Sequence, residues 1–530
     1  MKAVFVLFDS LCRNALGCYG SSWVRTPNFD RFAARGVTFE SHFVGSLPCM
    51  PARRDLHTGR LNFMHRSWGP LEPFDNSFPQ AMWLAGIHTH LVSDHLHYFE
   101  DGGATYHNRF RTWDFVRGQE YDAWKAMVQP PVAKLRAKYA AKHYDFDGTW
   151  RKPRDVYDGS WKRIQHAINS EWMVDEKDLP LARCFASGFE FLDLNRDADP
   201  WFLMLECFDP HEPFQAPARF KEPYATGWSG GILDWPLYEK STNSTPEEIG
   251  EIRANYAALV AACDHYFGQL LDYFDRHDLW RDTALILSTD HGFLLAEHDW
   301  WGKNLQPYYT EISHIPLIVH DPRHAGAAGA RRDAVTQTMD LMPTFLDLFD
   351  IAVPEEVRAR SVVPLLEADD PGHRDIGIFG MFGGPIGATD GRYTYYLYPG
   401  DLYGPGLHEY TLMPMHLSSL FSIDEMRTAA MHPGFDFTKG MPVMRIDALK
   451  DARRIPMHDG KRFDPGVGTT LYDLATDPRQ MKPFRDAVLE RRFHEGIARE
   501  LRAHDAPPEI YARYDIHTKT AEAATTLEAL

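Results

Sequence analysis

Short runs of apolar residues that stop at polar side chains recur along the chain. The first run, AVFVLF at 3–8, is unbroken and stops at Asp9. Such runs are typical of strands that are buried on both faces, as in a parallel sheet covered by helices. By the same pattern, further strands are predicted at 37–44, 88–97, 201–214, 283–292 and 316–322.

Helical patterns separate these strands. Residues 247–277 show the 3.6-residue periodicity of an amphipathic helix and form the strongest helix prediction in the chain. A shorter helix is predicted within 26–36, where Thr26 can cap, Pro27 suits the first position and Gly36 stops the helix. Strands that alternate with helices predict an α/β fold with a doubly wound, mostly parallel sheet and helices on both faces.

The pattern changes near residue 375. Beyond it, the chain continues with short aromatic strands such as 392–399 and then a helix at 487–504. We therefore predict a main α/β domain over 1–375, which would be the catalytic domain, and a smaller C-terminal α+β part over 376–530. Its last residues, TAEAATTLEAL, are expected to form a loosely held tail.

Two segments interrupt the main domain. Residues from about 115 to 180 are rich in Trp, Lys, Asp and Tyr and weakly periodic, which predicts an insertion near a site or at a subunit contact. Residues from about 215 to 246 contain several Pro and Gly breaks and two Trp, a pattern typical of a surface loop or lid. The insertion and the tail would suit the contacts of a homo-oligomer, either a dimer or a tetramer.

Composition and charge narrow the possible functions. With 44% hydrophobic, 25% charged and 13% aromatic residues, the chain is an ordinary globular protein, which excludes disordered, collagen-like and coiled-coil classes. Its formal net charge of −18 makes nucleic acid and anionic membranes poor partners. A local positive pocket for a small anion remains compatible with that balance.

The cysteines indicate a reducing compartment. None of them forms a CxxC pair, and they are scattered over positions Cys12, Cys18, Cys49, Cys184, Cys207 and Cys263. The apolar run that follows Lys2 is too short for the core of a signal peptide. Since no stretch approaches the roughly 18 apolar residues of a membrane span, we expect a soluble, cytoplasmic protein.

The sharpest chemical signal is C-x-P-x-R at Cys49–Arg53, followed by L-x-T-G-R at 56–60. Pro51 fits the first turn of a helix, so residue 49 is predicted at a helix N-terminus, where the dipole favours anions. Arg53 lies four residues on and on the same face. Its planar guanidinium can pair with two oxygens of an anionic ester.

This motif resembles the signature of sulfatases in the alkaline phosphatase superfamily. LGCYG (16–20), TPNFDRFAARGVTF (26–39) and LYDLATDP (471–478) extend the resemblance, although the family often has Ser where this chain has Ala52. The resemblance implies that a formylglycine-generating maturation enzyme oxidises Cys49 to formylglycine, an aldehyde. The hydrated aldehyde would attack sulfur or phosphorus, form a covalent ester on residue 49, and then expel it with its second hydroxyl.

A single divalent cation is also expected. Asp9 ends the first strand and Asp290 and His291 end a later one, and the carboxyl ends of parallel strands meet at one edge of a sheet. The oxygen of residue 49 would complete the ligand set. Sulfatases carry an acidic pair where this chain has Asp9 and Ser10, so a hydroxyl or a water would replace one carboxylate. Imidazole suits Mn²⁺ better than Ca²⁺, so Mn²⁺ is favoured and Ca²⁺ comes next.

The resemblance implies further catalytic residues. His211 lies in the context His-Glu-Pro-Phe and Lys303 in Trp-Gly-Lys, as in the family. Together with Arg53 and His97, they would hold the sulfuryl or phosphoryl oxygens. His211 or Lys303 would also help the leaving group to depart.

The histidines of SDHLHYF stand where many sulfatases have Lys-x-His. His97 fits that pattern and His95 departs from it. On a strand, the spacing of two residues would place both side chains on one face. The sequence does not decide the role of Asn76.

The predicted function is the hydrolysis of small anionic esters. Asp9-Ser10 and Asp290-His291 resemble the phosphonate monoester hydrolase branch, which favours phosphonate monoesters and phosphodiesters as substrates, with sulfate esters as well. A dedicated arylsulfatase is the first alternative. A catalytically silent metal-binding member, in which Cys49 stays a thiol, is the second. A metal-dependent phosphatase or phosphomutase with a Ser or Thr nucleophile is disfavoured by Cys49, Pro51 and Arg53.

Overall fold

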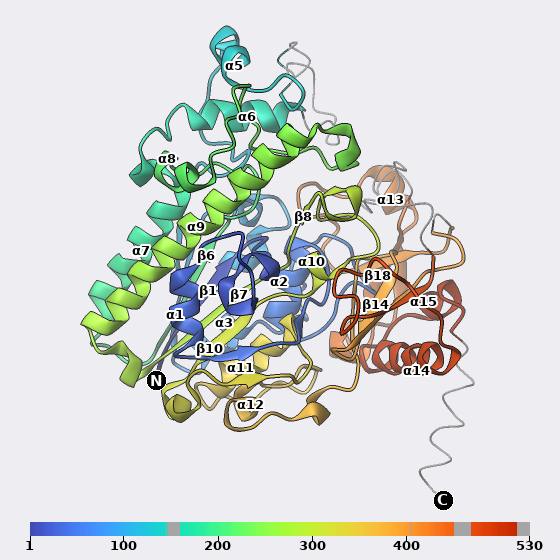
Figure 1. Ribbon diagram of the computed structural model, residues 1–530. Helices are drawn as coiled ribbons and strands as arrows, with labels where there is room; N and C mark the ends of the chain where they lie inside the picture. Colours follow the sequence, from blue (N-terminus) through green and yellow to red (C-terminus); the bar gives the residue numbers. More distant parts are fainter. Residues whose placement is uncertain (145, 147–159, 403, 450–467, 517–530) are drawn as a thin grey trace, which may run out of the picture.

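A computed structural model describes residues 1–144, 146, 160–402, 404–449 and 468–516. Its centre is an eight-stranded sheet with the order β11-β2-β10-β7-β1-β6-β4-β5 (Figure 1). The strand bounds are β1 Lys2–Phe8, β2 Val37–Phe39, β4 His88–Ser93, β5 Thr112–Phe115, β6 Trp201–Cys207, β7 Thr283–Thr289, β10 Leu317–His320 and β11 Arg331–Arg332. Only β10 runs antiparallel to its neighbours in this sheet. The predicted α/β fold with a mostly parallel sheet is confirmed.

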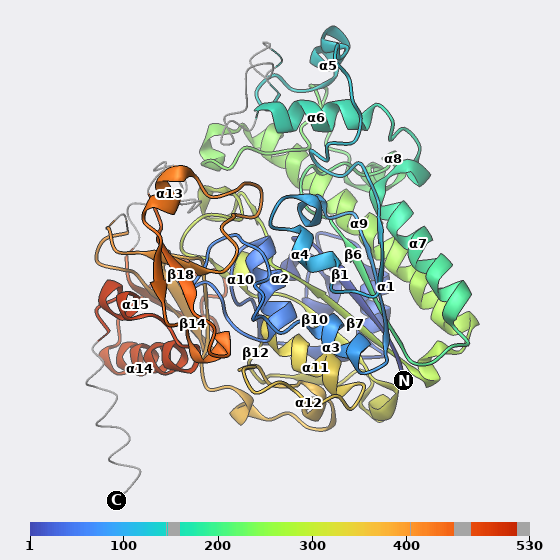
Figure 2. The same ribbon diagram turned by 180° about the vertical axis from the view of Figure 1, so that it is seen from behind.

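Helices cover both faces of the sheet because alternate residues of β1 enter two different cores. Val4 and Val6 pack into the first core, whereas Ala3 and Phe5 pack into the second. The first core is covered by α1 (Pro27–Ala33), α7 (Pro180–Asn195) and α9 (Pro246–Arg276), and the second by α3 (Phe78–Leu84) and α11 (Leu341–Asp347) (Figures 1 and 2). The unbroken apolar run of β1 therefore reflects burial on both sides.

The predicted strand 88–97 is shorter in the structure. β4 ends at Ser93, and a 3₁₀ turn follows at Leu96–Phe99. The Ser93 hydroxyl oxygen accepts the N–H of His95 at 3.0 Å, which turns the chain out of the strand. The prediction that His95 and His97 share one face of a strand is therefore wrong. The predicted strand 37–44 is likewise divided, into β2 and β3 (His42–Phe43).

The insertion and the predicted lid pack against each other. α5 (Val132–Lys138) and α6 (Ser160–Ser170) of the insertion lie at the top of Figure 1, and α8 (Ala218–Lys221) lies below α6. The Tyr144 hydroxyl donates to the Asp234 carboxylate at 2.6 Å. The two segments share a small core that includes Tyr139, Ile164 and Trp235. The region from 215 to 246 is therefore anchored to the insertion rather than free in solvent.

The chain beyond residue 376 forms two smaller antiparallel sheets. The first contains β13 (Gly377–Gly380), β14 (Ile386–Thr389), β15 (Tyr393–Leu397) and β19 (Thr470–Asp473), and the second contains β16 (His408–Thr411), β17 (Ala430–His432) and β18 (Val443–Asp447). Helix α14 (Ala487–Ala503) completes the predicted α+β part. Ile378 and Phe493 share a core with Leu47 and Phe63, so this part packs directly against the segment around the motif. The predicted tail lies outside the described residues.

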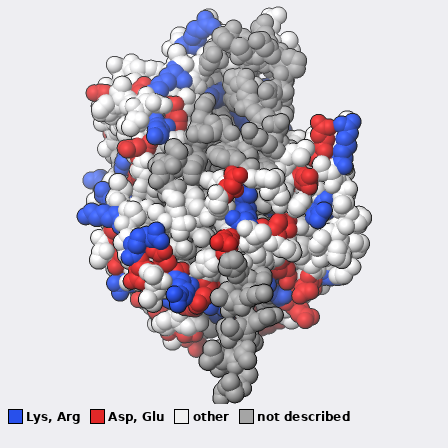
Figure 3. Space-filling model, turned by 90° about the vertical axis from the view of Figure 1, so that its right-hand side faces the viewer, with Lys and Arg blue, Asp and Glu red and all other residues white. Residues whose placement is uncertain are grey.

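The surface of this C-terminal side carries charges of both signs. Figure 3 shows Lys and Arg side chains interspersed with Asp and Glu side chains on the face that it presents. None of the helices among the described residues combines the length and the apolar composition of a membrane-spanning segment.

Candidate active site

The C-x-P-x-R motif forms the first turns of a buried helix. α2 (Cys49–Thr58) begins at Cys49, and Gly59 ends it in the left-handed conformation with φ 64°. All residues of the helix are buried. Pro48 stands at the N-cap and provides no side-chain hydrogen bond, and the first N–H of the helix with a backbone partner is that of Ala52, which donates to the carbonyl oxygen of Pro48 at 3.0 Å. Because Pro51 has no N–H, the N–H groups of Cys49 and Met50 are the ones without a partner inside the helix. The predicted helix and the placement of residue 49 at its N-terminus are confirmed.

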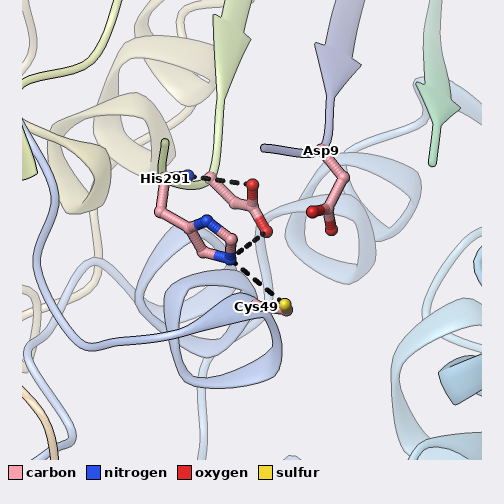
Figure 4. A group of neighbouring side chains, drawn as sticks. Asp9, Cys49 and His291 are labelled. Atoms are coloured by element: carbon pink, nitrogen blue, oxygen red, sulfur yellow. Dashed lines mark hydrogen bonds and ion pairs between the residues drawn. The ribbon is translucent and has the colours of Figure 1, made fainter. Parts of the chain in front are cut away.

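Four predicted ligands converge at the carboxyl edge of the sheet (Figure 4). Asp9 follows β1, Asp290 and His291 follow β7, and Cys49 approaches from α2. One ligand atom from each of the four lies within 4.8 Å of all the others, and all four residues are buried. Cys49 Sγ lies 3.1 Å from His291 Nε2, which in turn lies 3.4 Å from Asp290 Oδ2. Residue 49 is therefore next to the strand-end carboxylates.

The donor set fits one divalent cation. His291 Nδ1 lies 2.9 Å from the carbonyl oxygen of Gly292, and an N–H there leaves the lone pair of Nε2 directed at the cluster. Ser10 adopts φ 60°, and its N–H donates to Asp290 Oδ1 at 3.1 Å while its hydroxyl donates to Asp9 Oδ1 at 2.7 Å. Ser10 thus holds both carboxylates in place. Two carboxylates, one imidazole and an oxygen on residue 49 form a ligand set that divalent ions use.

Arg53 is the centre of a buried network of three carboxylates. Its Nη2 donates to Asp9 at 3.0 Å, its Nη1 to Asp290 at 2.6 Å and its Nε to Glu206 at 2.6 Å. Nη1 also donates to the carbonyl oxygen of Cys49 at 3.2 Å. The sequence predicted that the Arg53 guanidinium pairs with the oxygens of an ester, but in the structure its N–H groups donate mainly to carboxylates of the protein. The guanidinium fixes the two metal-ligand candidates relative to the motif helix.

Glu206 was missed by the sequence reasoning. It lies on β6, where its second oxygen accepts the Ser93 hydroxyl at 3.1 Å. The signal was present in the sequence, because Glu206 is the one charged residue in the apolar run 201–208. A carboxylate in the interior of a fully buried strand requires a partner. That partner is Arg53, which is fully buried as well.

Charges within the site hold one another in their ionised forms. Burial opposes the charge of Asp9, but Lys303 and Arg53 hold the pKa of that carboxyl well below its usual value. Burial would lower the pKa of Arg53, but Glu206, Asp290 and Asp9 raise it well above normal. With Lys303 included, three carboxylates face two fixed cations. A divalent cation would make the site positive, which suits an anionic ester.

Lys303 and His211 lie beside this cluster. Lys303 Nζ is 3.5 Å from Ser10 Oγ and 3.9 Å from Asp9 Oδ1, so its contacts are loose compared with those of Arg53. Burial lowers its pKa, yet the acidic groups around it leave the pKa above its usual value, so it stays protonated. His211 Nδ1 contacts the carbonyl oxygen of Glu212, while burial and then Lys303 lower the pKa of His211 well below normal.

The two histidines of the 93–99 segment differ in their partners. His95 Nε2 lies 3.7 Å from Asp9 Oδ2, whereas His97 Nδ1 lies 2.7 Å from Glu100 Oε2. Their rings are 5.1 Å apart. Of the pair, His95 is therefore the one that the structure brings against a predicted metal ligand. Asn76 contacts Glu356 and Lys439 instead of any residue of this site.

Fold and site together define an α/β protein with a buried, charged cluster of candidate metal ligands at the carboxyl edge of its sheet. The family model "Sulfatase" matches residues 2–351. The chain therefore belongs to the sulfatase family, and the predicted class of enzyme, a hydrolase acting on ester bonds, is confirmed.

Relatives of this chain are similar at low identity. An arylsulfatase of Clostridium perfringens is 23% identical over 70% of this chain and 79% of the relative. The multifunctional alkaline phosphatase superfamily protein PehA of Trinickia caryophylli is 24% identical over 66% of this chain and 73% of the relative. The phosphonate monoester hydrolase of Agrobacterium radiobacter shares the fold, with a TM-score of 0.62, 19% identity and coverage of 95% of both chains.

Proposed function

We propose that this protein is a formylglycine-dependent metallohydrolase that cleaves phosphonate monoesters, phosphodiesters and sulfate esters. The observation that carries the proposal is the position of Cys49, at the N-terminus of a buried helix that has no side-chain cap, and within one ligand group with Asp9, Asp290 and His291. When oxidised and hydrated, residue 49 would supply the attacking hydroxyl. A bound divalent ion, Mn²⁺ before Ca²⁺, would be held by this group and would lower the charge that opposes attack.

The residues around Cys49 have separate tasks in this proposal. The N–H groups of Cys49 and Met50 at the start of α2 and the ammonium of Lys303 would bind the non-bridging oxygens of the ester. Lys303 is the better proton donor for the leaving oxygen, because His211 is neutral and its Nδ1 is engaged by Glu212. Nε2 of His211 would then accept a hydrogen bond or a proton. Arg53 would keep the two carboxylates apart and aligned.

Two features support phosphorus esters beside sulfur esters. His291 and Ser10 replace oxygen ligands of the common sulfatase pattern, as the sequence resemblance to phosphonate monoester hydrolases implies. Both ester types present a tetrahedral centre with one negative charge, so the same cations serve both. We further propose that the protein acts in the cytoplasm as a homo-oligomer and that it requires a formylglycine-generating enzyme as its maturation partner.

The test compares two substrates on matured protein. Protein made together with a formylglycine-generating enzyme is analysed by mass spectrometry of the peptide around residue 49, and kcat/KM is measured on 4-nitrophenyl sulfate and on 4-nitrophenyl phenylphosphonate. We expect turnover of both, with the phosphonate preferred. Turnover of the sulfate alone would indicate the dedicated arylsulfatase. An unmodified thiol and no turnover would indicate the silent family member.

A further inference from the structure

The loop after β1 takes a left-handed turn at Ser10. Ser10 has φ 60°, a conformation that a residue with a Cβ keeps only when its surroundings hold it there. In this conformation the N–H of Ser10 donates to Asp290, and its hydroxyl donates to Asp9. The alignment of both carboxylates therefore depends on a backbone conformation that Ser10 does not favour by itself.

The hydroxyl of Tyr256 bridges this turn. Tyr256 lies on α9, a helix that covers one face of the sheet. Its hydroxyl donates to the carbonyl oxygen of Ser10 at 2.9 Å and accepts the N–H of Cys12 at 2.8 Å. Ser10 and Cys12 are both buried, and a buried backbone group without a partner is costly. The two bonds to Tyr256 therefore favour this turn over other conformations of the loop.

Other bonds join the same turn to the loop after β7. The N–H of Leu11 donates to the Thr289 hydroxyl at 3.1 Å, and Cys12 Sγ accepts the N–H of Phe293 at 3.2 Å. Of these contacts, only Cys12 Sγ approaches the carbonyl oxygen of Ser10, at 4.0 Å. The short hydrogen bond to that oxygen is the one from Tyr256.

The ring of Tyr256 is held by packing and not by its hydroxyl. Tyr256 is fully buried, and its ring stacks on that of Trp23 at 6.2 Å and meets that of Phe214 edge-to-face at 5.2 Å. A phenylalanine would fill the same space and keep these ring contacts. Removing the hydroxyl alone should therefore release the turn without opening a cavity in the core.

We propose that Tyr256 is a positioning residue for the metal centre, because its hydroxyl holds Ser10 in the conformation from which Ser10 aligns Asp9 and Asp290. The bonds of this hydroxyl go to the backbone of Ser10 and Cys12 and not to a candidate ligand, so Tyr256 acts through Ser10. The inference rests on the proposed function, because it concerns the ion that the same site would hold. It gives α9, which carries none of the candidate ligands, a part in building the site.

The test measures how tightly the chelator-treated full chain binds Mn²⁺ and Ca²⁺, by calorimetric titration, and kcat/KM on the two 4-nitrophenyl esters after reloading. Tyr256→Phe removes only the hydroxyl. Tyr273→Phe is the matched control, because Tyr273 is also a buried residue of α9 but its hydroxyl donates to Asp193 at 2.7 Å. Ser10→Gly provides a second background, since glycine adopts φ 60° without strain.

We expect Tyr256→Phe to weaken binding of the preferred ion about 10-fold, the lower end of the range for groups that orient metal ligands. kcat/KM at limiting metal should fall with it, whereas Tyr273→Phe should bind the ion as the wild type does. In the Ser10→Gly background, Tyr256→Phe should weaken binding less than about 3-fold, because glycine keeps the turn without help from the hydroxyl. A loss of packing alone would not depend on the residue at position 10.

Two results would contradict the inference: unchanged metal affinity in Tyr256→Phe, or the same loss in both backgrounds. If Tyr256→Phe does not fold, the double variant decides. A folded double variant that binds the ion as Ser10→Gly does supports the inference, and a double variant that also fails to fold overturns it.

The wild type separates this inference from the proposed function. A wild type that binds the ion but cleaves neither ester would overturn the proposed function, while the comparison of affinities would still decide the role of Tyr256. A wild type that binds neither Mn²⁺ nor Ca²⁺ would overturn both.

Discussion

Two buried clusters of ligand-type side chains exist in the described part of this molecule, and only one of them has the form of a reaction centre. The first is the group of Asp9, Cys49, Asp290 and His291 at the edge of the central sheet. The second is formed by Glu409, His416 and Glu425 in the C-terminal part. Both contain carboxylates and a histidine, and a buried arginine adjoins each, Arg53 in the first and Arg66 in the second.

The clusters differ in where their polar atoms point. In the second, His416 Nε2 lies 2.7 Å from Glu425 Oε1, and Glu425 Oε2 accepts the N–H of Ser422 at 2.6 Å. Glu409 Oε1 accepts both the N–H and the hydroxyl of Ser67. These bonds join the segment after the motif helix to the C-terminal sheet, so the second cluster has a structural role.

In the first cluster, the equivalent atoms face a common point. His291 Nε2 and Cys49 Sγ meet beside the carboxylates, and the loose contacts of Lys303 leave its ammonium able to bind another anion. In the second cluster the ligand-type atoms pair with one another and with Ser67 and Ser422, whereas in the first cluster hydrogen bonds from Arg53 and Ser10 hold the carboxylates so that one ligand atom of each of four residues faces the same point.

Replacing the nucleophile should have the largest effect. We expect Cys49→Ala to lower kcat by at least about 10³-fold, because no other group at the helix N-terminus can attack the ester. Thermal unfolding should change little, since the side chain is small and its thiol contributes one contact, with His291 Nε2 at 3.1 Å, to the hydrogen-bond network of the site. Cys263→Ala, a buried cysteine on α9, is the control and should retain turnover. Full activity of Cys49→Ala would mean that residue 49 is not the nucleophile.

Removal of the metal ion should have the next-largest effect on turnover. We expect a chelator to abolish turnover, Mn²⁺ to restore more of it than Ca²⁺, and elemental analysis to find one ion per chain. The melting temperature should fall on removal, because the carboxylates then lose a partner cation. His291→Asn should shift the preference towards Ca²⁺, since an amide oxygen replaces the imidazole nitrogen. An unchanged preference in that variant would exclude His291 as a ligand.

Glu206→Gln tests the missed residue. Removing the charge of Glu206 weakens the hydrogen bond that its carboxylate accepts from Arg53 Nε at 2.6 Å. The guanidinium can then shift relative to Asp9 and Asp290. Groups that orient ligands in this way typically contribute about 10–100-fold to activity or metal affinity, and we expect a loss in that range for both. Metal affinity measured by titration separates this from simple unfolding. Ser93→Ala removes only the 3.1 Å bond to the same carboxylate and should cost less.

The fold and the positions of the candidate site residues were largely predictable because they depend on local patterns. Unbroken apolar runs identify strands buried on both faces, and the polar residues that end β1 and β7 must meet at one edge once those strands pair in parallel register. The position of Cys49 followed from Pro51 and from the motif. The order of the strands along the chain and their parallel pairing are enough to predict these positions.

What the sequence missed depends on contacts between distant residues. The predicted cap Thr26 makes no side-chain cap; Asp264 of α9 accepts the N–H groups of Asn28 and Phe29 instead, at 2.9 and 2.8 Å. Glu206 was hidden in an apolar run because its partner Arg53 lies more than 150 positions away. A side chain whose partner lies on a distant helix or strand cannot be recognised from the hydrophobic periodicity of its own element.

The smallest predicted effect on catalysis concerns the second cluster. Glu425→Gln keeps the size of the side chain but weakens the bonds to His416 and Ser422, so we expect about 1–2 kcal/mol less stability in urea unfolding. kcat/KM and the metal content should stay at the wild-type level, because these bonds fasten the C-terminal sheet rather than hold an ion. Asp424→Asn is the matched control: its exposed pair with Arg427 should contribute less than about 0.5 kcal/mol. A second metal ion per chain in the wild type that disappears in Glu425→Gln would reverse the comparison and make this cluster a binding site.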